Sequence, residues 1–75
     1  MSEHQYEIDV DEANDSYTIV DGNGVTLVSN PIPAYGVDYK RFLADAMVAE
    51  YQTNGISDNL VEMFYVAFAE TYSVV

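Results

Sequence analysis

Carboxylates dominate the side chains of this sequence that could do chemistry. The 75-residue chain has thirteen Asp and Glu residues, no cysteine, and one histidine, His4, near its start. Among so many acids, proximity alone indicates no acid–base pair, because catalysis needs a pair held in a defined geometry. No serine or threonine stands in a recognisable motif with a base, and the Gly-Asn-Gly segment at 22–24 lacks the pattern of a phosphate-binding loop. We therefore expect a non-enzymatic protein without catalytic residues or cofactors.

Calcium binding is the first alternative use of these acids. The run DVDEAND, which starts at Asp9, resembles the beginning of a calcium-binding loop. An EF-hand loop needs an oxygen ligand at its fifth position, glycine at its sixth and a bidentate glutamate at its twelfth. Counted from Asp9, these positions hold Ala13, Asn14 and Val20. The sequence therefore predicts no metal site, only weak and nonspecific cation binding.

A row of acids is the main candidate for function. Alternation over residues 6–11 separates Tyr, Ile and Val from Glu7, Asp9 and Asp11, which indicates a half-buried strand with its acids outside. We call these three acids the acidic row. Alternate strand residues lie ~7 Å apart, an interval similar to the spacing of phosphates along a nucleic-acid strand. The candidate partner-binding residues are Glu7, Asp9, Asp11, Glu12, Asp15 and Asp21.

The charge balance limits the partners that such a row could have. Only Lys40 and Arg41 oppose the thirteen acids, and the formal net charge is −11. This imbalance excludes nucleic acid and anionic membranes as direct partners, because their phosphates would be repelled. A basic protein surface remains, and the row could fill a DNA- or RNA-binding channel by matching its Lys and Arg residues. The alternative is a solvated outer face, in a small acidic or halophile-type domain, since an open sheet face needs polar residues in any case.

Length and hydropathy indicate one small domain, residues 1–75, which acts in the cytoplasm. A chain of this size buries only ~60% of its unfolded surface. The first ten residues lack the basic and apolar regions of a signal peptide. The longest nearly uncharged apolar run, residues 63–69, is too short to span a membrane.

A β-meander over residues 6–29 is the element that must position the acidic row. The β-branched runs at 16–20 and 25–29 flank the Gly-Asn-Gly segment, which predicts an antiparallel hairpin. Residues 12–15 carry turn-forming side chains between the first strand and the hairpin. We expect residues 1–5 to form a frayed tail.

Loop length sets the register of this hairpin. A three-residue loop at 22–24, with its last glycine left-handed, pairs Ile19 with Leu27. A two-residue loop would instead pair Val20 with Leu27. The longer loop is preferred, because it gives one consistent apolar face. That face consists of Tyr17, Ile19, Val25 and Leu27.

Two helices are predicted over residues 38–75, after a proline-containing linker at 30–37. Asp38 and Ser57 are the expected N-caps, and the first helix should stop near Asn54-Gly55. The last five residues are β-prone, so a terminal strand is the alternative to a longer second helix. On the first helix the apolar stripe is Tyr39, Phe42, Leu43, Ala46 and Met47. On the second, the predicted buried residues are Leu60, Met63, Phe64, Ala67, Phe68, Thr71, Val74 and Val75.

The expected fold class is therefore α+β. A three-stranded antiparallel sheet is followed by a helical hairpin packed on one of its faces, in the order βββαα. One sheet face is then covered by helices, and the acidic row lies on the other.

A second candidate surface lies beside the core stripe of the second helix. Tyrosine is common at protein interfaces, because it offers a large rigid area with a polar tip. Burial within the small domain is the competing interpretation of these residues, and a homodimer is one partner option. The residues are Val61, Tyr65, Ala69 and Tyr72.

In length, net charge, lack of cysteine and the run EIDVDEAND, the chain resembles small acidic inhibitors encoded by bacteriophages. These are the anti-CRISPR and antirestriction proteins that mimic DNA. The resemblance lies in composition and implies binding to the nucleic-acid channel of a bacterial defence complex in the host cytoplasm. One departure is that Glu50, Glu62 and Glu70 fall on the predicted helices rather than beside the acidic row.

Overall fold

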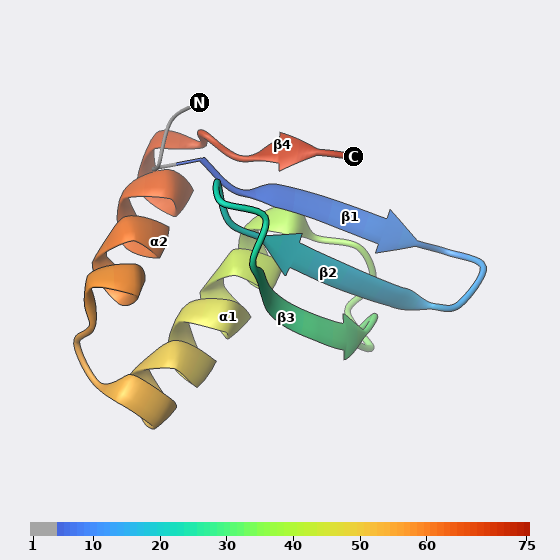
Figure 1. Ribbon diagram of the computed structural model, residues 1–75. Coiled ribbons are helices and arrows are strands. Elements are labelled where there is room, and N and C mark those ends of the chain that lie inside the picture. Colours follow the sequence, from blue (N-terminus) through green and yellow to red (C-terminus); the bar gives the residue numbers. More distant parts are fainter. Residues whose placement is uncertain (1–4) are drawn as a thin grey trace.

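The computed structural model describes residues 5–75, which form a four-stranded sheet with two helices on one of its sides (Figure 1). The strand order is β3-β2-β1-β4; β1 is antiparallel to β2, and β2 to β3. This confirms the α+β prediction of three antiparallel strands followed by a helical hairpin. Most of the predicted frayed tail, residues 1–4, lies outside the described residues. The elements are β1 (Glu7–Asp11), β2 (Ser16–Val20), β3 (Thr26–Pro31), α1 (Tyr39–Asn54), α2 (Asp58–Ala69) and β4 (Ser73–Val74).

The chain after α2 forms a strand, so the prediction of helix to residue 75 is wrong and its alternative is correct. The helix ends where Glu70 adopts a left-handed conformation, with φ 55° and ψ 43°. The strand β4 then lies parallel to β1, with Ser73 opposite Glu7. The backbone N–H of Ser73 donates to the carbonyl of Tyr6, and that of Val75 to the carbonyl of Ile8, each at 2.8 Å. The acidic row therefore lies on an interior strand of the sheet.

The hairpin has the predicted three-residue loop but not the predicted register. Asp21 N–H donates to the Val25 carbonyl at 3.0 Å, and Gly24 has the expected positive φ of 83°. Beyond the loop, however, Ile19 lies opposite Val28 and Val20 opposite Thr26. Leu27 is therefore the extra residue of a β-bulge, and both predicted pairings of Leu27 are wrong.

The bulge also changes which residues face the core. Val25 is 55% exposed, although it was predicted to be buried, whereas Leu27 and Val28 are both half-buried against the core. Because a bulge sets two residues against one, neighbouring side chains can both approach the core. Strand β3 also continues to Pro31, two residues past the predicted end of the meander.

The helix boundaries follow the predicted capping residues. The Asp38 carboxylate accepts the Arg41 N–H at 3.1 Å, and the Ser57 hydroxyl accepts the Leu60 N–H at 3.0 Å. The same Ser57 hydroxyl donates to Glu50 at 2.7 Å and so ties the second helix to the first. No helix within residues 5–75 has the length and apolar character needed to cross a membrane.

The core lies between the sheet and the helical hairpin, and its centre is aromatic. The rings of Tyr17 and Phe42 stack with centroids 3.8 Å apart and planes 5° from parallel. Phe64 and Phe68, which were predicted to be buried, are 58% and 82% exposed. The buried residues are Tyr6, Ile8, Tyr17, Ile19, Phe42, Leu43, Ala46, Met63 and Val66.

Alkaline pH should destabilise this core through Tyr6. Its ring is buried and its hydroxyl donates to Asn59 Oδ1 at 2.9 Å. Burial, aided by the negative charges of Glu62, Asp21 and Glu50, raises the pKa of Tyr6 to about 12. The folded state thus holds this proton more tightly than the unfolded state does, so its contribution is complete below about pH 10 and is lost as the pH rises through 12.

A thermal melting series between about pH 9 and 12 measures this effect. The melting temperature should fall over the upper part of that range, and Tyr6→Phe should flatten the fall. Tyr51→Phe is the matched control, because Tyr51 is an exposed tyrosine on α1. Equal pH profiles for Tyr6→Phe and the unchanged chain would contradict the prediction.

Candidate functional site: the acidic face of the sheet

The acidic row lies on the sheet face that the helices leave open. Glu7, Asp9 and Asp11 are exposed, whereas Ile8 between them is fully buried against the helices. Because side chains alternate along a strand, the three acids project from the same face at intervals of ~7 Å. The backbone that carries them is paired to β2 along its whole length. A strand held in this way keeps the spacing of its carboxylates fixed.

The row is flanked by small uncharged residues. Across the β1–β2 ladder, Asp9 lies opposite Thr18 and Asp11 lies opposite Ser16. On the other side, Ser73 of β4 lies beside Glu7. Short hydroxyl side chains leave the carboxylates as the most prominent groups on this part of the sheet. An approaching partner therefore meets a single line of negative charge.

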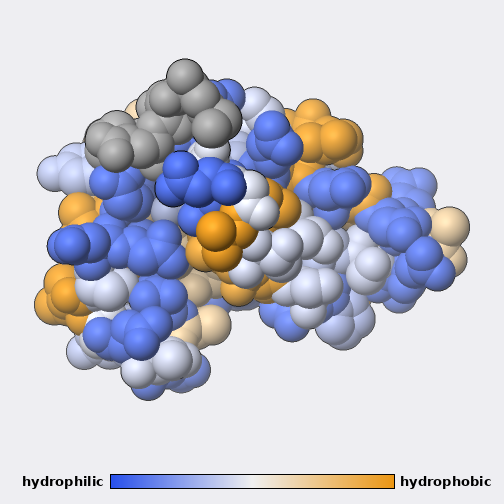
Figure 2. Space-filling model, viewed as in Figure 1, coloured by the Kyte–Doolittle hydropathy of each residue, from blue (hydrophilic) through white to orange (hydrophobic). Residues whose placement is uncertain are grey.

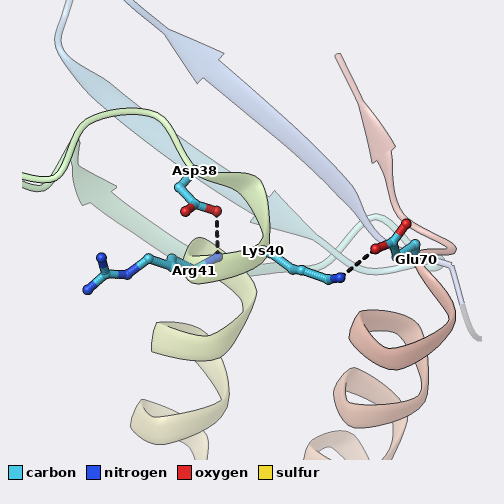
Figure 3. Close-up of polar contacts among 4 residues, drawn as sticks. All are labelled: Asp38, Lys40, Arg41 and Glu70. Carbon is cyan, nitrogen blue, oxygen red and sulfur yellow. Dashed lines mark hydrogen bonds and ion pairs between the residues drawn. The ribbon is translucent and has the colours of Figure 1, made fainter.

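The two basic residues lie elsewhere, at the start of α1 (Figure 3). Lys40 reaches across to Glu70 at the end of α2 and forms an ion pair with it. Arg41 points away from Lys40, and its guanidinium lies 4.0 Å from the centre of the Tyr35 ring. Among residues 5–75, neither forms an ion pair with the acidic row. The negative field of the open face is thus not neutralised by the described part of the chain.

Asp11, at the end of the row, also shapes the turn between β1 and β2. Its carboxylate accepts the Asn14 side-chain amide at 2.7 Å and the Asn14 backbone N–H at 3.3 Å. These hydrogen bonds hold the pKa of Asp11 below its usual value. Asp11 therefore stays ionised at acidic pH while it stabilises the turn.

Asp21 has a comparable structural role in the β2–β3 loop. Its Oδ1 atom accepts the backbone N–H of Asn23 at 2.8 Å and that of Val25 at 2.9 Å. Asp21 and Glu7 also line one shallow hollow of about 350 Å³ at this end of the sheet. Asp21 thus extends the acidic surface beyond the first residue of the row.

Glu12 and Asp15 extend it at the opposite end. Both are exposed in the β1–β2 turn, where Asp15 adopts a left-handed φ of 54°. Hydrophilic side chains gather over this turn, at the right of the view in Figure 2. The six predicted partner-binding acids therefore follow β1 and the two turns at its ends.

These acids do not converge as metal ligands do. Among residues 5–75, no three carboxylate or histidine side chains form a group that could hold a metal ion. Asp11, which would be a ligand in a calcium loop, is instead bonded to Asn14. The geometry spreads negative charge along a line, which suits an extended basic surface better than a point charge.

The second predicted surface is only partly as expected. Val61, Tyr65 and Ala69 are exposed on α2, but Tyr72 lies beyond the helix and packs, half-buried, against the core. The prediction for Tyr72 is wrong because it assumed a helix that continues past Glu70. The exposed rings of Phe64 and Phe68 were missed, since α2 is apolar on most of its sides and helical periodicity did not identify the core side.

No protein-family model matches the chain, and no curated protein or solved structure shows significant similarity to it.

Proposed function

We propose that this protein is a non-enzymatic inhibitor that occupies a basic nucleic-acid-binding surface of a partner protein. The acidic row takes the place of phosphates, as in the anti-CRISPR and antirestriction proteins that the composition resembles. The observation that supports this proposal is the line of exposed carboxylates, Glu7, Asp9 and Asp11, on a strand without basic neighbours among the described residues.

The electrostatics of such a surface favour fast and selective association. Complementary potentials steer two proteins together and penalise partners of the same sign. A net charge of −11 on 75 residues gives a strong field for this steering. Because the strand is paired on both sides near Glu7, little order has to be imposed on it when a partner binds.

The solvated-face alternative explains the outward carboxylates equally simply, but it predicts no partner. A test of function must therefore show binding, and binding of the expected chemical type. Loss of binding with salt is the expected signature, because exposed charges interact weakly beyond ~8 Å at physiological ionic strength.

The experiment is capture from a bacterial lysate on the immobilised chain. We expect a basic nucleic-acid-binding protein to be retained at about 0.05 M salt, and released by duplex DNA or by about 0.5 M salt. Immobilised polyglutamate is the control, because it has charge without the fixed spacing of the strand. Retention of no protein beyond those held by polyglutamate would contradict the proposal, as would a partner that duplex DNA does not displace.

A further inference from the structure

The outer side of the helical hairpin is apolar and open to solvent. Ile56 and Phe68 are 80% and 82% exposed, and Phe64 and Tyr65 are more than half exposed. Apolar surface is also visible along the left margin of Figure 2, beside α2. A helix that is apolar all round is normally buried on all sides. We call this surface the aromatic face and define it by Tyr51, Ile56, Val61, Phe64, Tyr65 and Phe68.

The rings of this face are ordered against one another. Phe64 and Phe68 stack with centroids 6.3 Å apart and planes 14° from parallel, and Tyr65 meets Phe64 edge-on at 6.4 Å. Phe64 and Phe68 also line a hollow of about 380 Å³ together with Ala44 and Met47 of α1. Tyr51 follows Met47 by four residues and so extends the same side of α1. The surface is thus continuous across both helices.

We infer that two copies of this chain associate through their aromatic faces. The exposed parts of the six side chains amount to roughly 800 Å², which is about the area that each partner buries in a standard stable interface. A twofold axis would bring each patch against its own copy, as in most symmetric dimers. Stacked rings with a neighbouring hollow supply both a projection and a recess for such contact.

The distribution of charge favours a second copy over a basic partner at this surface. Lys40 lies at the edge of the hollow, and its charge is already paired with Glu70. Helical spacing places Asp45 and Glu50 on either side of the α1 stripe that contains Tyr51, not within it. A basic surface would gain no ion pairs there and would lose its own hydration. A second aromatic face loses little on contact.

Repulsion between the two acidic rows does not prevent this association. The rows lie on the open sheet face, with the helical layer between them and the aromatic face. The shortest dimension of the Cα trace is 20 Å, whereas charges are screened over ~8 Å at physiological ionic strength. The dimer therefore displays two acidic rows that point away from each other.

Sedimentation of the full chain at about 0.15 M and about 1 M salt tests the inference. We expect a dimer at micromolar concentration that tightens with salt, because screening weakens the repulsion between two chains of charge −11. Acid-mediated binding to a basic partner changes with salt in the opposite direction. Phe64→Ser with Phe68→Ser should weaken the dimer at least tenfold.

The matched control is Val25→Ser with Val75→Ser, two exposed apolar residues outside the aromatic face. It should leave the dimer constant unchanged. Circular dichroism checks that each variant remains folded. A monomer at about 100 µM in high salt, or a dimer that survives the double phenylalanine change, would overturn the inference. A monomer whose capture of a basic protein requires Phe64 and Phe68 would assign the aromatic face to that protein instead.

Discussion

Phe42→Ala should destabilise the fold by about 3–5 kcal/mol, the usual cost of removing a buried phenylalanine ring. Phe42 is fully buried on α1, and its ring stacks on Tyr17 of β2. Removing it opens a cavity where the helical layer meets the sheet. A domain of this length has a total stability on the order of 4–11 kcal/mol, so the variant should lose most of its margin.

Urea denaturation followed by circular dichroism measures this loss. Phe68→Ala is the matched control, because the same ring is removed from a side chain that is 82% exposed. The control should change the unfolding free energy by less than about 0.5 kcal/mol. Both variants are compared at a concentration where the chain is monomeric, since dissociation would otherwise contribute. Equal losses from the two variants would show that Phe42 is not central to the core.

Glu7→Gln with Asp9→Asn should weaken binding to a basic partner roughly 30-fold, from about 1 kcal/mol for each charge pair lost. Among the described residues these two carboxylates form no ion pair, so the fold should not depend on their charge. Asp11 is left intact because its carboxylate stabilises the β1–β2 turn. Titration calorimetry with the captured partner measures the change in affinity.

A control must change the net charge equally without touching the acidic row. Gln52→Lys with Thr53→Lys does so, because both residues are exposed on the last turn of α1. It adds two positive charges, as the Glu7 and Asp9 changes remove two negative ones. If both double variants weaken binding equally, only net charge matters, and the acidic row is not the contact surface.

The elements that sequence reasoning predicted well are those with local signals. The alternation of β1 and the caps Asp38 and Ser57 act through residues within a few positions of each other, and the structure confirms them. The outward direction of the acidic row follows from the same alternation.

The features that were missed depend on packing between distant segments. The bulge at Leu27 lets two neighbouring apolar residues approach the core, and no local pattern specifies it. In α2, Val66 rather than Phe64 and Phe68 faces the core, although all three are apolar. The pairing of β4 depends on a partner strand more than sixty residues earlier in the chain. Sequence periodicity carries no information about such choices when every side of a helix is apolar.

The position of β4 limits how β1 can be recognised. An uncovered strand invites a partner to join the sheet through its main chain. Here Ser73 and Val75 already occupy the outer edge of β1 at Tyr6 and Ile8, and β2 occupies the inner one. A partner at that end of β1 can therefore reach side chains but not amides. Recognition there depends on the sign and interval of the carboxylates, so evolution could exchange Asp and Glu along β1 freely while holding their alternation fixed.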